Sequence, residues 1–205
     1  VAVAGQTPSR RGAASAAGRP GGSALLQRAK AMVLSPKDEW PKIAAESAPS
    51  SEIFTRYVVP LAAIGPLASL IGGQAFGYGA FGFHYRPGLG FSITTALVSF
   101  VLTLVGIIVL TLIADFLAPR FGGQARRDNA FKLVAYGSTA SFLAGIFGLI
   151  PSLGFFGLLG LYSLYLYYTG AGPLMKVPED KAMSYTAVTI VAAVILSMVV
   201  MPVTA

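Results

Sequence analysis

The sequence predicts an all-α integral membrane protein: a bundle of five transmembrane helices with a cytoplasmic N-terminal amphipathic segment. Of its 205 residues, 55% are hydrophobic and only 11% are charged, whereas a soluble domain carries about 25% charged residues. The charges also leave long gaps, and the segment 133–175 contains none. Because one crossing of the hydrocarbon core needs about 20 helical residues, this gap has room for two crossings. A membrane barrel would instead show segments of about 10 residues with alternating polarity.

Five apolar segments are long enough to cross the membrane. Pro151 and Gly154 interrupt the uncharged segment midway and predict a tight turn between the third and fourth crossings. The first crossing contains Pro60 and Pro66, so we expect it to be kinked or broken. The predicted crossings are 57–73, 91–117, 131–150, 152–169 and 183–203.

The basic residues predict the orientation. All but one of the 15 Lys and Arg residues precede the first crossing, follow the second or fourth, or stand at the edge of the third, as Lys132 does. Only Arg86 lies in the connection after the first crossing. Because positively charged loops stay in the cytoplasm, the N-terminus is predicted to be cytoplasmic and the C-terminus to lie outside. The net charge of +7 therefore reports orientation and contact with anionic headgroups, and no nucleic acid partner is expected.

The N-terminal quarter of the chain divides into two parts. Residues 1–22 are mostly Ala, Gly, Ser, Pro and Arg, and with almost no large apolar side chains they predict a disordered tail. Residues 23–50 predict cytoplasmic amphipathic and short helical segments, with Ser35 and Pro36 starting a second helix. The membrane domain then occupies residues 51–205.

The segment 23–34 has one apolar helical face with basic residues beside it. This pattern is typical of a helix that lies on an anionic membrane surface. A Trp that follows such a helix is typical of an interfacial anchor. The alternative is that the apolar face packs against the protein's own cytoplasmic loops. The predicted membrane-surface residues are Leu25, Leu26, Arg28, Lys30, Met32, Val33 and Trp40.

Small residues recur at helical spacing in the third and fourth crossings, which permits helices to approach closely. The main interpretation is packing within one bundle, and the alternative is the surface of a homo-oligomer or a contact with other membrane proteins. The residues are Gly137, Ser141 and Gly145 at a spacing of four, and Gly154, Gly157 and Gly160 at a spacing of three.

Asp115 is the only carboxylate within an apolar segment, and an ionisable residue at membrane depth is a candidate functional site. Counting about 20 residues from the start of the second crossing places it at the cytoplasmic headgroup boundary. There it is predicted to pair with Arg120 or Lys132. The alternatives are an ion or proton site and a contact with a partner.

The composition excludes most catalytic chemistry. With no cysteine and one histidine, the chain cannot form a disulfide, a thiol nucleophile or a thiolate metal site. We therefore expect no catalytic residues, cofactor or metal. A small transporter or channel is the competing class, although such proteins usually place polar or charged groups near the midplane. The hydroxyls that such a path would use are those of Ser92, Thr94, Thr95, Ser99, Thr103 and Thr111.

The ordered set of local motifs resembles the bacterial branch of the Yip family of five-span membrane proteins. The likeness covers residues 25–203 and depends on the order of the pieces. They are Gln27-Arg28-Ala29-Lys30, Ser35-Pro36-Lys37-Asp38-Glu39-Trp40-Pro41, Ile43-Ala44-Ala45-Glu46, the segments 60–66, 115–119, 121–123, 160–167 and 174–178, and then Lys181, Ala182 and Tyr185.

This resemblance implies five spans with a cytoplasmic N-terminus, in a bacterial inner membrane. Eukaryotic relatives act in vesicle traffic and bind lipidated Rab-type GTPases, but their Asp-Leu-Tyr-Gly-Pro motif is absent here. No catalytic residues are carried over. The resulting hypothesis is a non-enzymatic membrane protein that binds a partner or organises the bilayer in a trafficking-like role.

Overall fold

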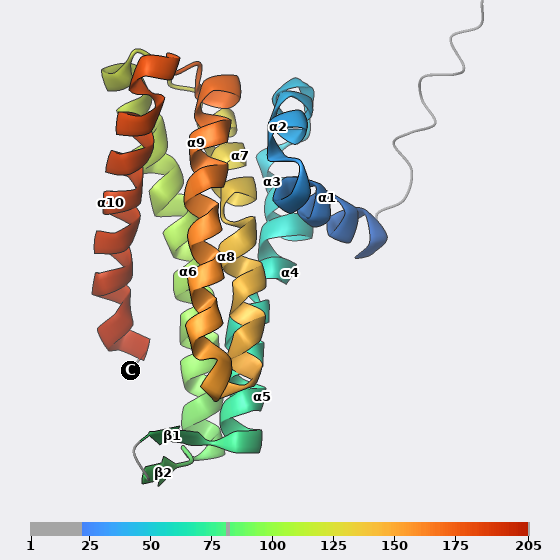
Figure 1. Cartoon of the computed structure of the whole chain (residues 1–205), viewed down its shortest axis with the longest axis vertical. Coiled ribbons are helices and arrows are strands. Elements are labelled where there is room, and N and C mark those ends of the chain that lie inside the picture. The colour runs from blue at the N-terminus through green and yellow to red at the C-terminus, as the bar shows by residue number, and fades with distance from the viewer. Residues whose placement is uncertain (1–21, 81–82, 205) are drawn as a thin grey trace, which may run out of the picture.

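The computed structural model describes residues 22–80 and 83–204, and the tail predicted at 1–22 lies outside them except for Gly22. The helices that follow the N-terminal region run along one common axis and form an elongated bundle (Figure 1). The N-terminal helices pack beside one end of this bundle, and α10 ends toward the other (Figure 1). The chain is thus a helical membrane-type bundle with an N-terminal attachment.

The first two helices, α1 (Gly22–Leu34) and α2 (Pro36–Ala45), are separated only by Ser35. They lie against the side of the bundle, and α1 projects obliquely outward from it (Figure 1). Pro36 starts α2 because its missing N–H costs nothing at the first helical position. We call α1 and α2 together the N-terminal helix pair.

The first apolar segment is broken, as the prolines predict. It consists of α3 (Ser50–Ile53), a π-helical turn (Phe54–Val58), α4 (Val59–Ala62) and α5 (Ile64–Phe76). Pro60 has no N–H to continue the α-helical pattern, and the backbone widens just before it, where the N–H of Val59 bonds the carbonyl of Phe54. This prediction of a kinked first crossing is confirmed.

A short antiparallel strand pair follows α5, which the sequence analysis did not anticipate. Strands β1 (Tyr78–Ala80) and β2 (Phe83–Tyr85) pair with Tyr78 opposite Tyr85. Gly77 ends α5 at a φ of 68°, a conformation that glycine adopts without steric cost. The hairpin closes the end of the bundle opposite the N-terminal helix pair (Figure 1).

The remaining helices run back and forth along the bundle (Figure 1). The long helix α6 (Leu89–Leu117) ends in a 3₁₀ turn, η2 (Ala118–Phe121). After it come α7 (Arg127–Gly137), α8 (Thr139–Ala144) and the 3₁₀ segment η3 (Gly145–Leu149). The chain turns at Ile150 and returns through η4 (Pro151–Leu161) and α9 (Tyr162–Met175), and α10 (Glu179–Thr204) completes the bundle.

Within the described residues, four helices are long and apolar enough to cross a membrane. They are Ser50–Phe76, Leu89–Phe121, Arg127–Leu149 and Glu179–Met198. The predicted crossing at 152–169 is also helical, but it is divided between the 3₁₀ segment η4 and α9. Glycines weaken an α-helix, and η4 carries three of them at a spacing of three residues. The membrane bundle is therefore shown, while the count of five crossings stays a prediction.

Candidate functional site

Charged side chains gather at one end of the bundle. Apart from Arg86, every Asp, Glu, Lys and Arg of the described residues belongs to one of three regions: the segment before α4, the stretch from the last turn of α6 into α7, and the junction of α9 with α10. Figure 1 shows these regions together at the end that carries the N-terminal helix pair. Two features of this charged end are candidates for a functional site: the docked N-terminal helix pair and a groove beside Asp115.

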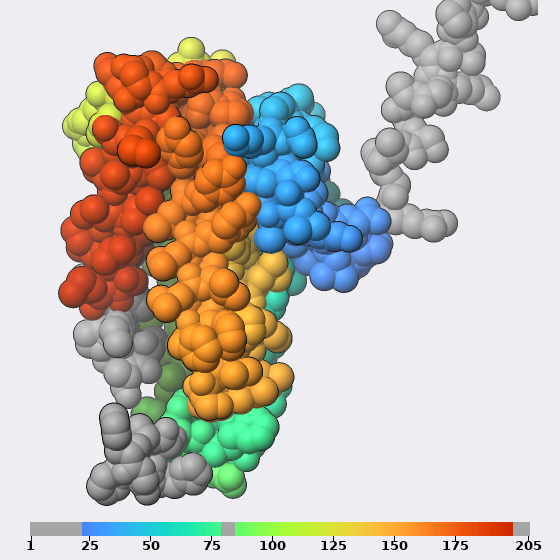
Figure 2. Space-filling view, in the orientation of Figure 1, coloured from blue at the N-terminus to red at the C-terminus, as the bar shows by residue number. Residues whose placement is uncertain are grey.

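The first feature is the docking of the N-terminal helix pair onto α7 and α9. Trp40 is 0% exposed, and its Nε1 donates a hydrogen bond to Thr169 Oγ1 at 3.0 Å. Its indole lies against Gly170, where an added Cβ would stand only 2.8 Å from the ring. Figure 2 shows α2 seated against the bundle, with α1 extending outward from it. The Trp40 side chain thus anchors the pair to protein.

Ion pairs join the two helices of the N-terminal helix pair to each other. Arg28 of α1 contacts Glu39 Oε1 at 2.6 Å through Nη1 and binds Glu46 through Nη2. Glu39 is only 7% exposed and also binds Lys42 at 3.0 Å. Burial tends to lower the pKa of Arg28, but the hydrogen bond and charge of Glu46 outweigh it and raise the pKa. Arg28 therefore ties α1 to both ends of α2.

A lysine from the bundle completes the interface. Lys132 of α7 is buried, and its Nζ donates to the backbone carbonyl of Ile43 at 3.2 Å and to that of Glu46. These carbonyls belong to the last turn of α2 and the residue after it, where helix carbonyls lack intrahelical partners and a cation is favoured. Lys132 thus caps α2 from the bundle.

The structure places some of the predicted membrane-surface residues inside the protein and others on its surface. Met32 and Trp40 are inside the protein, so their assignment to the membrane surface is corrected. The physical reason is that the apolar stripe is wide enough for one edge to pack on the bundle while the other stays outside. Leu25 and Val33 are half-buried, Arg28 is in the ion pairs, and Leu26 and Lys30 are exposed.

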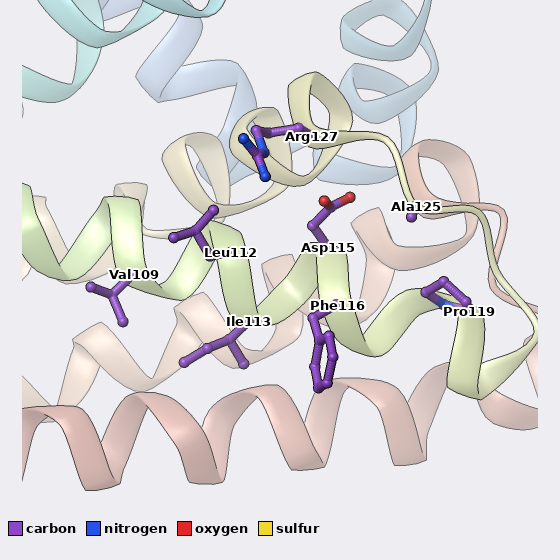
Figure 3. A pocket seen from close by; sticks show the side chains of 8 residues that line it. All are labelled: Val109, Leu112, Ile113, Asp115, Phe116, Pro119, Ala125 and Arg127. Atoms are coloured by element: carbon purple, nitrogen blue, oxygen red, sulfur yellow. The ribbon is translucent and has the colours of Figure 1, made fainter.

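The second feature is a groove beside Asp115, between the end of α6 and the start of α7 (Figure 3). Its volume is about 630 Å³ and its walls are mainly apolar. Figure 3 shows the carboxylate of Asp115 and the guanidinium of Arg127 on the same side of the groove. The lining residues are Val109, Leu112, Ile113, Asp115, Phe116, Pro119, Ala125 and Arg127.

Asp115 does not form the ion pair that its sequence context predicted. Neither Arg120 nor Lys132 binds it among the described residues: Arg120 stacks over the ring of Phe116 at 3.6 Å, and Lys132 caps α2. Asp115 Oδ1 is buried and has no hydrogen-bond partner in the described part of the chain. Arg120 and Lys132 both make other contacts, so Asp115 Oδ1 is left without a hydrogen-bond partner in the described part of the chain.

The side chains that line this groove have the chemistry to bind another molecule. A carboxylate oxygen without a partner accepts a hydrogen bond or binds a cationic group, and the apolar wall favours a nonpolar neighbour of that group. No cluster of three or more His, Cys, Asp or Glu residues occurs in residues 22–80 and 83–204 that could hold a metal ion. The arrangement is suited to contact with a partner segment.

Replacing Asp115 by asparagine is expected to change the free energy of unfolding by about 1 kcal/mol or less, because no ion pair is lost. Thermal denaturation of the purified variant measures this. A loss of several kcal/mol would show that Asp115 has a structural partner. A loss of ion flux in liposomes with the fold preserved would assign it to a conduction path.

The predicted packing residues fall into two groups. Four lie at helix contacts within the chain: a Cβ on Gly137 would stand 3.1 Å from the Tyr167 ring, Ser141 Oγ donates to Ser163 Oγ at 2.9 Å, Gly145 touches Gly65, and Gly160 touches Ser141. A Cβ added to Gly154 or Gly157 would meet no described atom of a neighbouring segment within 4 Å, so their packing within one bundle is corrected, and the alternative of an oligomer surface stays a prediction.

Two glycines make close contacts that the sequence pattern did not predict. A Cβ on Gly72 would collide with the carbonyl oxygens of Gly148 and Leu149. Gly170 is pressed between Trp40 and Leu133, with a Cβ there 2.6 Å from Leu133 Cδ1. The adjacent glycines in the first crossing were a signal for the Gly72 contact, whereas Gly170 gave none, because its partner Trp40 is distant in sequence.

Comparison with known proteins identifies the family. No curated protein matches the chain, and no solved structure does. The Yip1 domain family matches residues 30–201, which span the N-terminal helix pair from α1 onward, the charged end and the bundle into α10. The chain therefore belongs to the Yip1 domain family.

Proposed function

We propose that this protein is a non-enzymatic Yip-type membrane protein that organises the bilayer at its cytoplasmic face. The observation that carries the proposal is the position of α1. This helix projects obliquely from the side of the bundle (Figure 1), and Arg28, Trp40 and Lys132 hold the helix pair in place. A helix that leaves the side of a membrane bundle near its charged end is placed to rest on the bilayer surface.

The outer face of α1 has the composition of a membrane-surface helix. Leu26 is 64% exposed and Leu34 is 67% exposed, and Lys30 is exposed between them in sequence. Apolar side chains beside a cation are typical of helices that enter the headgroup layer. The helix of 13 residues would cover about 20 Å of bilayer surface. A helix inserted there separates the lipids of one leaflet and leaves the other leaflet unchanged.

The charge distribution supports the proposed orientation. The charged end carries all the described basic residues except Arg86, and the positive-inside rule assigns such an end to the cytoplasm. With η4 and α9 as a crossing, the bundle has five crossings and the C-terminus lies outside, in a bacterial inner membrane. Reporter fusions after Gly123 and after Ala205 should then report opposite sides of the membrane.

The test measures the depth of α1 in the bilayer. Because the chain contains no cysteine, single cysteines at Leu26, Leu34 and the exposed control position Lys37 can be spin-labelled in the full-length protein in anionic liposomes. We expect oxygen to relax the labels at Leu26 and Leu34 more than a water-soluble nickel chelate does, and the reverse at Lys37. Water-like behaviour at all three sites would refute the proposal.

A second readout separates membrane organisation from mere attachment. Vesicles reconstituted with the protein at high density should be smaller by cryo-electron microscopy than vesicles with the variant Leu26→Asp/Leu34→Asp. The matched control is Gln27→Asp/Ser35→Asp, which adds the same two acidic residues at exposed, uncharged polar positions. If the two variants behave alike, charge rather than the apolar face determines vesicle size, and the proposal fails. The groove beside Asp115 would then support the alternative of partner binding.

A further inference from the structure

A second groove lies between α5 and α6, away from the charged end, where the strand hairpin closes the bundle. Its volume is about 470 Å³. Residues from α5, both strands and α6 line it, among them Pro66, Tyr78 and Tyr85. Phe91 at its edge is exposed, so the groove opens on the outer surface of the bundle, where lipids lie. We call it the hydroxyl groove, for the side chains described next.

One face of α6 brings four hydroxyls into this groove. Ser92, Thr95, Ser99 and Thr103 follow each other at spacings of three, four and four residues, which places them on one side of the helix. Thr94 does not follow this spacing. Its side chain is exposed outside the groove, and its hydroxyl donates a hydrogen bond to the carbonyl of Gly90. The groove therefore collects the polar face of a helix that is otherwise apolar.

Two of these hydroxyls have no hydrogen-bond partner within the described chain. Thr103 donates to the carbonyl of Ser99 at 2.8 Å, and Ser92 accepts from Gln74 Nε2 at 2.7 Å. No hydrogen bond of Thr95 Oγ1 or Ser99 Oγ occurs in residues 22–80 and 83–204. In hydrocarbon an unpaired hydroxyl is unfavourable, and in this arrangement both donors are open to acceptors from outside the chain.

The depth of the two donors matches the upper part of a lipid. Gln74, Ser92 and the backbone of Pro87 form a polar junction where α5 and α6 meet the hairpin. Thr95 lies about 4.5 Å below Ser92 along the helix, and Ser99 about 10 Å below it. The polar layer of a leaflet is about 5 to 7 Å thick. Thr95 and Ser99 therefore lie on either side of the lower edge of this layer, where the ester carbonyls begin the acyl chains.

A cation stands at the headgroup level of the same end. Arg86 is exposed and donates one Nη2 hydrogen bond to the carbonyl of Ala75 at 3.2 Å, which leaves further N–H donors of the guanidinium for a ligand. It is the only basic residue of the described chain away from the charged end. A guanidinium at this level binds a phosphate group well.

We infer that the hydroxyl groove binds one glycerophospholipid of the non-cytoplasmic leaflet. Arg86 contacts the phosphate, and the hydroxyls of Thr95 and Ser99 donate to the ester carbonyls. The acyl chain continues along the groove toward Thr103, whose own hydroxyl is satisfied within the helix. An ester carbonyl accepts hydrogen bonds and donates none, so it matches a hydroxyl whose hydrogen has no acceptor within the chain.

The experiment measures lipid retention by the intact protein. Full-length protein purified in detergent is mixed with diacyl phosphatidylglycerol, and native mass spectrometry counts the lipids that remain bound. We expect one retained lipid, held about tenfold more weakly by the variant Thr95→Val/Ser99→Ala, which loses two hydrogen bonds. The control Thr94→Val, whose hydroxyl bonds its own helix, should retain lipid like the unaltered protein.

A matched ligand makes the test specific for the carbonyls. Dialkyl ether phosphatidylglycerol has the same headgroup and chains but no ester carbonyls, and we expect it to be retained about tenfold more weakly by the unaltered protein. Equal retention of the two lipids, or equal retention by the double variant, would overturn the inference. Rapid labelling of Ser99→Cys in liposomes by a membrane-impermeant thiol reagent would also overturn it, because the groove would then hold water.

Discussion

Replacing Trp40 by alanine is expected to detach the N-terminal helix pair from the bundle, at a cost of about 3 to 5 kcal/mol. The indole is fully buried, fills the space above Gly170 and binds Thr169. Alanine would leave a cavity and a hydroxyl without its donor. Limited proteolysis of the full-length protein measures the change, because the connection between α2 and α3 becomes accessible once the pair is released.

The variant Trp40→Phe is the matched control. Phenylalanine keeps the ring in the pocket and removes the hydrogen bond to Thr169, so we expect a loss of only about 1 kcal/mol. The spin label at Leu26 should also leave the bilayer in Trp40→Ala and stay there in Trp40→Phe. If Trp40→Ala is cleaved no faster than the unaltered protein, the contacts of Lys132 with the carbonyls of Ile43 and Glu46 are enough to hold the helix pair on the bundle.

Replacing Gly72 by alanine is expected to separate α5 from η3, with a loss of stability at or above the usual 1 to 3 kcal/mol for overpacking. The new Cβ would collide with the carbonyl oxygens of Gly148 and Leu149. These are backbone atoms, which cannot change rotamer as a side chain would. Thermal denaturation of the purified protein, followed by size-exclusion chromatography, should show a lower transition temperature.

The control for this prediction is Gly157→Ala. Gly157 also lies in an apolar helical segment, but no described atom stands within 4 Å of its added Cβ. We expect this variant to be unchanged or slightly more stable, since alanine has the higher helix propensity. Equal destabilisation by both substitutions would mean that glycine flexibility, and not the close contact, determines the effect at Gly72.

The sequence by itself determined that the chain forms a bundle of apolar helices, while the orientation of that bundle stays a prediction. Hydrophobicity acts locally and additively along a chain, so apolar residues alone located the four helices that are long and apolar enough to cross a membrane. The same spacing placed Asp115 at the end of the second crossing, and the structure has it in the last turn of α6. The hydrogen-bonding requirement in lipid favours helices for any apolar segment of this length, so no knowledge of contacts was needed for these conclusions.

Only the tertiary structure decided which faces meet. The apolar stripe of α1 fitted a lipid surface and a protein surface equally well, because both are apolar. The structure divided it by burying Met32 and leaving Leu26 outside. Gly145 and Gly157 have the same local chemistry, yet one touches Gly65 and the other touches nothing described. The partners of Asp115, Trp40 and Lys132 likewise depend on how segments distant in sequence come together, and periodicity within one helix carries no information about its neighbours.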